Sequence, residues 1–114
     1  MQERIHSIIQ ILDEKKTEDI KIIDMSKQEY FVKYVIIGTT LGEKHALSLI
    51  DELQIKLKAK GEEFLHIESS EEWSVIDLGD ILIHLLTPEY RGIYNIEELL
   101  ENLKKIKSKK SIFK

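Results

Sequence analysis

Residues 73–86, WSVIDLGDILIHLL, constrain the fold more than any other stretch of this sequence. Two short runs rich in isoleucine, leucine and valine lie on either side of Leu78-Gly79. Runs of this length and composition around a glycine predict a β-hairpin. A two-residue turn at Leu78-Gly79 would give these cross-strand pairs: Asp77 with Asp80, Ile76 with Ile81, Val75 with Leu82, Ser74 with Ile83 and Trp73 with His84.

This register divides the hairpin between two faces, because successive side chains of a strand point to opposite sides of a sheet. One face carries side chains that suit a core: Ile76, Leu78, Ile81 and Ile83. The other face carries a mixed set: Trp73, Val75, Asp77, Asp80, Leu82 and His84. A tryptophan among aliphatic residues, with carboxylates at the tip, is typical of a surface that a partner protein covers. The alternative is that Trp73 and His84 pack beneath a helix, with the histidine hydrogen-bonded.

The rest of the chain alternates between helical and strand patterns. Apolar residues at helical spacing predict an amphipathic helix over residues 2–15. Isoleucine, valine and aromatic residues predict strands at 19–25 and 30–39, and a third strand at 63–69. The first two runs are almost continuously apolar, which indicates central positions in a covered sheet.

Two further helices follow from capping signals. Thr40 and Glu43 have the spacing of a capping box ahead of a helix predicted at 43–60, and Gly61 provides its stop. Asn95 with Glu98 predicts the start of a last helix. Its apolar side is expected to contain Leu99, Leu100, Leu103 and Ile106.

The predicted order is helix, two strands, helix, three strands, helix. This order does not alternate strictly, so it argues against a purely parallel, doubly wound sheet. It favours an α/β fold with a mixed five-stranded sheet flanked by helices. The portion from 30 to 68 is expected to cross over right-handedly, and the hairpin to add antiparallel pairing at one side.

Length and charge suggest one domain with a tail. The 114 residues fit a single domain at 1–103, followed by a lysine-rich tail at 104–114. The tail holds six lysines and no acidic residue, so residues 1–103 carry a charge of −10 against −4 for the chain. An acidic body is repelled by bare nucleic acid and attracted to a basic protein.

The tail allows two interpretations. It forms either peripheral contacts with nucleic-acid phosphates or a lysine-rich helix end that aids solubility. The lysines concerned are Lys104, Lys105, Lys107, Lys109 and Lys110.

Several classes of protein are disfavoured. The sequence has no cysteine, which excludes disulfides and thiolate chemistry. It has no apolar run of about 20 residues and no cationic, apolar leader, so a cytoplasmic protein is expected. Asp77, Asp80 and His84 lack the spacing of a metal site, and VIIGTTLGEKH matches no phosphate-loop motif. We therefore expect no cofactor, no metal and no enzymatic activity.

Three blocks of the sequence resemble a known family. They are EDIKIIDM, YFVKYVIIGTTLGEKHALSLIDEL and WSVIDLGDILIHLLTPEYRGIYNIEELL. They are similar to successive blocks of the ribosomal silencing factor family, also called the Iojap-related family, over roughly residues 10–100. The resemblance implies a nucleotidyltransferase-like fold without catalytic residues. It also implies binding to an L14-type protein of the large ribosomal subunit, which blocks joining of the small subunit and represses translation when nutrients are short.

The resemblance also implies a contact surface. The matching positions are Trp73, Asp77, Leu78, Gly79 and Asp80, with His84, Pro88, Glu89, Tyr90, Arg91 and Tyr94 beside them. The sequence departs from many relatives at Leu78, where they carry an aromatic residue.

Other functions stay open on the sequence. One is an enzyme of nucleotidyltransferase type, and another is an RNA-binding factor for ribosome assembly that acts through the tail. Exposed sheet edges leave both a monomer and a homodimer open.

Overall fold

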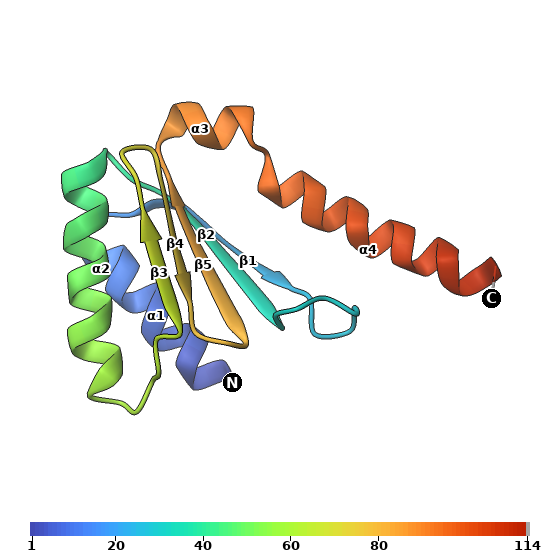
Figure 1. Cartoon of the computed structure of the whole chain (residues 1–114), viewed down its shortest axis with the longest axis horizontal. Coiled ribbons are helices and arrows are strands. Elements are labelled where there is room, and N and C mark those ends of the chain that lie inside the picture. Colours follow the sequence, from blue (N-terminus) through green and yellow to red (C-terminus); the bar gives the residue numbers. More distant parts are fainter. Residues whose placement is uncertain (114) are drawn as a thin grey trace.

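The computed structural model describes residues 1–113, and the side chains of residues 1–105. Within this part of the chain, helices and strands follow one another in an order close to the predicted one (Figure 1). They are α1 (Gln2–Glu14), β1 (Glu18–Asp24), β2 (Tyr34–Thr39), α2 (Glu43–Lys58), β3 (His66–Ser69), β4 (Trp73–Asp77), β5 (Ile81–Leu86), α3 (Pro88–Ile93) and α4 (Ile96–Phe113).

The strands form one mixed sheet in the order β1-β2-β5-β4-β3. β2 and β5 are parallel, whereas β1–β2, β5–β4 and β4–β3 are antiparallel. The predicted mixed five-stranded sheet is therefore confirmed. The hairpin of β4 and β5 does not sit at the side of the sheet, however, because β5 is its central strand.

Helices cover both faces of the sheet. α1 and α2 lie together on one face, while α3 and the start of α4 lie at the other (Figure 1). Side chains between the sheet and α1 and α2 form the larger core: Ile5, Ile8, Ile11, Leu12, Ile36, Leu49, Ile50, Leu53, Leu57, Ile76, Leu78, Ile81, Ile83 and Leu85. The smaller core on the other face contains Ile23, Met25, Val32, Val35, Ile37, Leu82, Leu86 and Leu100.

The predicted hairpin exists, but its predicted register is wrong by two residues. Trp73 pairs with Leu86 and Val75 pairs with His84, and the turn is at Gly79-Asp80. Gly79 has φ +95°, which glycine adopts without strain. The burial of Leu78, whose amide donates to the carbonyl of Ile81, excludes it from the turn.

The predicted faces of the hairpin survive this shift, with one exception. A shift of two residues keeps every strand side chain on its own face, because side chains alternate with a period of two. Leu78 and Ile76 lie in the larger core, as expected. Asp80 is the exception, because it is in the turn and reaches α1 rather than the face of Trp73.

β1 was expected at the centre of the sheet, and this is wrong. It is an edge strand that pairs only with β2. Ile23 is its one buried residue, and Ile22 is 49% exposed. A left-handed backbone at Asp19 and a register shift between Glu18 and Lys21 interrupt its pairing. Such irregularities protect an exposed edge from pairing with another chain.

The predicted capping box of α2 is also wrong. Its N-cap is Gly42, and no side chain caps the helix. Thr40 is held instead beside the sheet, where its amide donates to the carbonyl of Leu86. At the other end α2 stops at Lys58, and Gly61 serves the following turn with φ +91°.

The helices after the sheet differ from the prediction in two respects. α3 was not expected, although Thr87-Pro88 is an N-cap followed by proline at the first helical position. The predicted start of α4 is confirmed, because Asn95 Oδ1 accepts from the amide of Glu98. Leu100 is buried, but Leu99 is 58% exposed rather than in the core. The side chain of Ile106 lies outside the described residues.

The core assignment of β5 predicts a large loss of stability on truncation. Ile83 is fully buried, so Ile83→Ala should lower the free energy of unfolding by about 2 to 5 kcal/mol in urea denaturation. Ile22→Ala is the matched control, since it makes the same change in an edge strand at a half-exposed position. Equal losses in the two variants would contradict the assigned faces.

Candidate functional site

The structure separates the expected contact residues into two groups at opposite ends of the sheet. Trp73 begins β4 and Asp77 ends it, about 13 Å apart along the strand. Asp77, Leu78, Gly79 and Asp80 lie at one end, where the hairpin turns. Trp73, His84, Pro88, Glu89, Tyr90, Arg91 and Tyr94 lie toward the other end, on β4, β5 and α3 with its C-cap.

The carboxylate of Asp80 is engaged within the fold. The guanidinium of Arg4, on α1, donates two hydrogen bonds to Asp80, of 2.6 and 2.8 Å, and two to Glu62, of 2.6 and 2.9 Å. These hydrogen bonds hold the pKa of Asp80 below its ordinary value. Asp77 also has a local role, because Oδ1 accepts from the amide of Gly79 in the turn. The carboxylate of Asp80 is therefore not free at the tip of the hairpin.

Four rings form a row across β5, β4 and α3, which we call the aromatic row: His84, Trp73, Tyr94 and Tyr90. The ring centroids of His84 and Trp73 are 5.8 Å apart, and the Nε1–H of Trp73 donates to His84 Nδ1 at 3.0 Å. Trp73 and Tyr94 are 5.2 Å apart, and Tyr94 and Tyr90 are 5.4 Å apart. All three contacts are tilted, and their centroid distances lie within the range of favourable ring contacts.

The aromatic row combines features of both expected alternatives. Trp73 and His84 are partly buried, and the histidine is hydrogen-bonded, as expected of rings that pack beneath a helix. Tyr94 is 48% exposed, however, so the row also reaches the surface. Ile93, next to Tyr94 in the chain, is an apolar residue that is 69% exposed. Sequence reasoning missed Ile93, because the helix α3 that presents it was not expected.

A threonine ties α3 to the β3–β4 turn. Thr87 Oγ1 donates to Glu72 Oε2 at 2.7 Å and accepts from the amide of Tyr90 at the start of α3. The amide of Thr87 also donates to the carbonyl of Glu72. Trp73 follows Glu72 directly, so this contact fixes the position of Tyr90 relative to Trp73.

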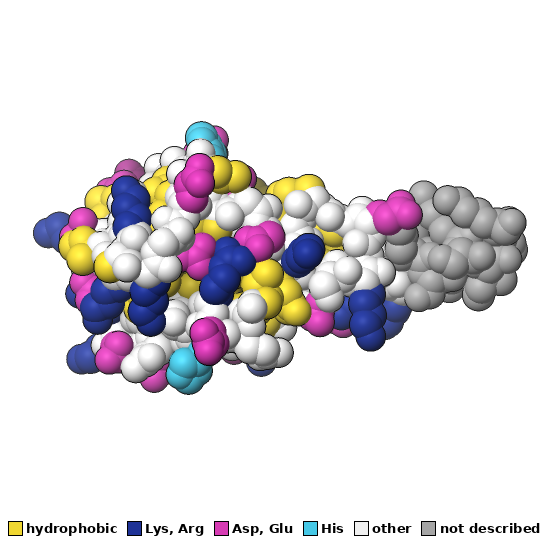
Figure 2. Space-filling view, turned by 90° about the horizontal axis from the view of Figure 1, so that it is seen from below, with side chains coloured by type: hydrophobic (Ala, Val, Ile, Leu, Met, Phe, Trp, Pro, Cys, Tyr) yellow, Lys and Arg dark blue, Asp and Glu magenta, His cyan; other side chains and the backbone are white. Residues whose placement is uncertain are grey.

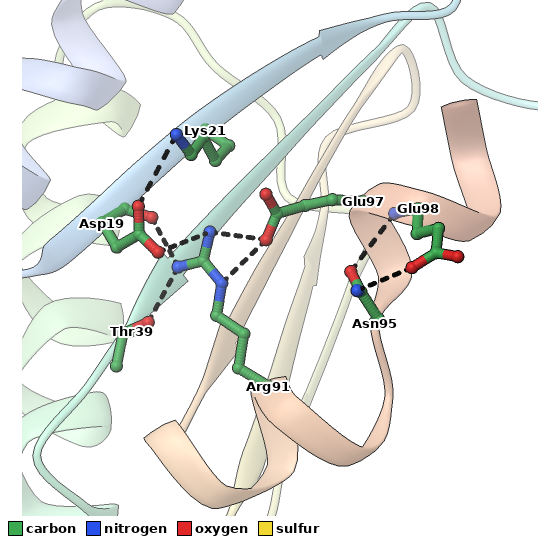
Figure 3. A network of polar contacts seen from close by, with 7 residues as sticks. All are labelled: Asp19, Lys21, Thr39, Arg91, Asn95, Glu97 and Glu98. Atoms are coloured by element: carbon green, nitrogen blue, oxygen red, sulfur yellow. Dashed lines mark hydrogen bonds and ion pairs between the residues drawn. The ribbon is translucent and has the colours of Figure 1, made fainter. Parts of the chain in front are cut away.

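Arg91 holds α3 and α4 against β1 and β2, and Figure 3 shows its contacts. Its Nε and Nη2 donate to Glu97 Oε1 at 2.9 and 2.8 Å, and its Nη1 donates to Thr39 Oγ1 at 2.8 Å and to the carbonyl of Asp19. The Asp19 carboxylate lies 3.6 Å from Nη2. With only 10% of its side chain exposed, Arg91 acts within the fold more than at the surface.

Shallow depressions lie beside Arg91 and beside the aromatic row. One of about 510 Å³ lies beside Arg91 and is also lined by Glu18, Asp19, Thr39 and Glu97. Another of about 350 Å³ borders Trp73, Val75 and Glu68. In the residues that the structure describes, no group of three or more histidine, aspartate or glutamate side chains is placed to hold a metal ion. No helix in the same residues is long and apolar enough to cross a membrane.

The charges of the body are mixed rather than segregated on the face that Figure 2 shows, where acidic and basic side chains alternate. Near the aromatic row the exposed charges are mainly acidic. Exposed carboxylates precede Trp73 at Glu71 and Tyr90 at Glu89, and Glu68 and Glu98 are also exposed.

His84 is neutral in the folded protein at ordinary pH. Burial lowers its pKa from 6.5 to about 4, because a charged imidazolium is poorly solvated in the row. A tryptophan N–H only donates, so Nδ1 of His84 is the acceptor and its proton resides on Nε2.

The pKa of His84 predicts a pH dependence of stability. Below pH 6.5 the unfolded chain takes up a proton at His84 that the folded protein excludes, so the free energy of unfolding falls as the pH falls toward about 4. Between pH 7 and about pH 4.5 the protein should lose roughly 2 to 3 kcal/mol more than His84→Asn, measured by urea denaturation. Asp80 is present in both proteins, so its contribution cancels. Identical pH profiles would show that the imidazole is not buried in this way.

Comparison with known proteins identifies the family. The family model described as "Ribosomal silencing factor during starvation" matches residues 1–113. Ribosomal silencing factor RsfS of Chromobacterium violaceum is 32% identical over 101 residues, which cover 87% of this chain and 83% of that protein. A mouse protein named "Mitochondrial assembly of ribosomal large subunit protein 1" is 25% identical over 100 residues, covering 83% of this chain and 44% of that protein.

The fold agrees with that of a solved relative. A crystal structure of a protein from Chromobacterium violaceum superposes with a TM-score of 0.80 and 32% sequence identity, covering 86% of this chain and 83% of that chain. The finer likeness to nucleotidyltransferases stays a prediction. The family model matches nearly the whole sequence and the fold is shared with a relative of similar length, so this chain belongs to the ribosomal silencing factor family.

Proposed function

We propose that this protein silences ribosomes by binding the large subunit through an L14-type ribosomal protein, where it sterically blocks joining of the small subunit. It acts in the cytoplasm and without catalysis. The observation that carries this proposal is the aromatic row, which is partly exposed at one end of a sheet in a protein of the silencing factor family. The name of the mouse relative, which refers to the large subunit, supports the choice of subunit.

Aromatic side chains suit the centre of such a contact. Partly exposed tryptophan and tyrosine rings bury a large area on binding at low entropic cost, and interfaces concentrate their binding energy in them. Here the rings of Trp73 and Tyr94 are in tilted contact at 5.2 Å, and Ile93 is a further exposed apolar residue next to Tyr94 in the chain. We assign the energetic centre of the contact to Trp73, Tyr90 and Tyr94.

The surrounding carboxylates suit a basic partner. Glu71 and Glu89 are exposed beside the row, and residues 1–103 carry a net charge of −10. Ribosomal proteins are basic, so this charge attracts them and raises the association rate. Rim charges of this kind contribute more to rate and orientation than to affinity.

The tail is proposed to add contacts with RNA phosphates. α4 begins beside the row and extends beyond the sheet, which directs its lysine-rich end away from the acidic body (Figure 1). Lys104 lies 3.7 Å from Glu101 on the same helix, and Lys105 is exposed. The side chains of Lys107, Lys109 and Lys110 lie outside the described residues.

The contact surface predicts the effect of removing its tryptophan. Trp73→Ala should weaken binding to purified large subunits by roughly 2 kcal/mol or more, because it removes the anchor and the support of Tyr94. Cosedimentation with separated subunits measures binding, and a subunit-joining assay measures the block. We expect the variant to fail in both.

Two further variants make this test specific. Phe31→Ala removes an aromatic ring that is 67% exposed outside the row, so it should bind normally. Asp77→Lys reverses a charge at the other end of β4, and it should slow association while retaining most of the affinity. If a folded Trp73→Ala protein bound large subunits and blocked joining like the unmodified protein, the contact surface would be misassigned.

The tail predicts a change in salt dependence. Deleting residues 104–114 should weaken large-subunit binding modestly and flatten its dependence on salt. With fewer phosphate contacts, binding releases fewer counterions from the RNA. Lys44→Ala removes an exposed lysine on α2 and should leave the slope unchanged. Unchanged affinity of the deleted protein at low salt would assign the tail a role in solubility alone.

A further inference from the structure

The only polar atom of the Trp73 indole is already bonded within the protein. Its Nε1–H donates to His84 Nδ1 at 3.0 Å, across the boundary between β4 and β5. The two residues are not directly opposite, because His84 pairs with Val75 and Trp73 pairs with Leu86. They are diagonal neighbours, a position within reach of long aromatic side chains.

This hydrogen bond limits how the indole can be oriented. Tryptophan has two side-chain torsions, and a bond from Nε1 to a fixed strand residue restricts both of them. Tyr94 contacts the indole from α3 at a centroid distance of 5.2 Å. The indole is therefore held from two elements, by a directional bond from β5 and by ring contact from the C-cap of α3.

We propose that His84 is a positioning residue: its Nδ1 lone pair holds the indole of Trp73 in the orientation that binds the partner. This inference rests on the proposed function, and it assigns His84 a role other than direct contact. Because Nε1–H is occupied, the indole offers its partner an apolar ring rather than a hydrogen-bond donor. The complementary site is an apolar pocket.

Preorganisation gives this arrangement its effect on affinity. An anchor that is ordered before binding does not lose rotamer freedom when the complex forms. The lowered pKa of His84 is consistent with this role, since a protonated imidazole has no lone pair at Nδ1 to accept the bond. The competing explanation is that the imidazole ring only fills space between Trp73 and the sheet.

Two substitutions separate these explanations. In His84→Asn, Oδ1 takes the place of Nδ1 on the same γ carbon, so the acceptor is kept and the ring is lost. In His84→Phe the ring is kept and the acceptor is lost. Trp73 is the single tryptophan of the chain, so the indole Nε1–H resonance and tryptophan fluorescence anisotropy report on this residue alone.

We expect His84→Asn to keep a downfield indole resonance, high anisotropy and near-normal large-subunit binding. His84→Phe should shift that resonance upfield, lower the anisotropy and weaken binding roughly two- to tenfold. The opposite pattern, with Phe tolerated and Asn impaired, would overturn the proposal. Equal behaviour of both variants would overturn it as well. If His84→Phe did not fold, His84→Leu would replace it: both His84→Leu and His84→Asn lack the ring, and only His84→Asn keeps the acceptor, so the proposal again expects the upfield shift, lower anisotropy and weaker binding in His84→Leu alone.

The experiment also distinguishes this inference from the proposed function. The resonance and anisotropy are measured on the free protein, so they test the positioning of Trp73 without a ribosome. If the unmodified protein failed to bind large subunits, the proposed function would fall while these readings still decided whether His84 orients the indole.

Discussion

β2 and β5 lie side by side in parallel near the middle of the sheet, and side chains cover most of both their faces. Their carboxyl ends meet at one edge, where Thr39 pairs with Leu86. The chain leaves β5 at that edge, so α3 begins there with Thr87 as its N-cap, and Arg91 comes within reach of Thr39. The position of the aromatic row thus depends on this one parallel pairing, because α3 and its C-cap carry two of the four rings.

Polar contacts make this end of the molecule rigid. Arg91 joins α3 to β1, β2 and α4, and Glu72 joins the start of α3 to the β3–β4 turn. His84 adds a third contact, to the indole of Trp73. A surface held in this way changes little on binding, so a modest area of aromatic contact retains more of its binding energy. This rigidity suits the contact with the large subunit that we propose.

The sequence predicts those features of the sheet that follow from the periodicity of apolar residues. It predicts poorly those features that depend on single contacts between distant residues. The faces of β4 and β5 follow from alternation, so an error of two residues in register leaves them correct. The turn position depends on Gly79 with φ +95° and on the burial of Leu78, which the apolar pattern alone does not reveal. The place of β1 at the edge is set by long-range pairing, although its apolar run resembles that of a central strand.

The candidate site likewise contains a part that the sequence predicts and a part that it does not. Alternation along the hairpin places Trp73 and His84 on one face, the family resemblance adds Tyr90 and Tyr94, and the structure brings all four into one row. The tip of the hairpin is different, because the partner of Asp80 is Arg4, 76 residues away in the sequence. No local pattern indicates that pair. α3 was within reach of sequence reasoning, since Thr87-Pro88 carries a recognisable helix start.

Arg4 connects the first helix to two segments that lie far along the chain. Its contacts join α1 to residues 58 and 76 positions further along the chain, and they close loops as long as many disulfides do. The chain contains no cysteine, so these segments are connected by charge-assisted hydrogen bonds and not by a disulfide. A reducing environment leaves such hydrogen bonds intact, whereas salt or acid weakens them. The polar part of the docking of the first helix thus responds to the ionic composition of its surroundings and is independent of their redox potential, while its buried apolar side chains hold it in the core.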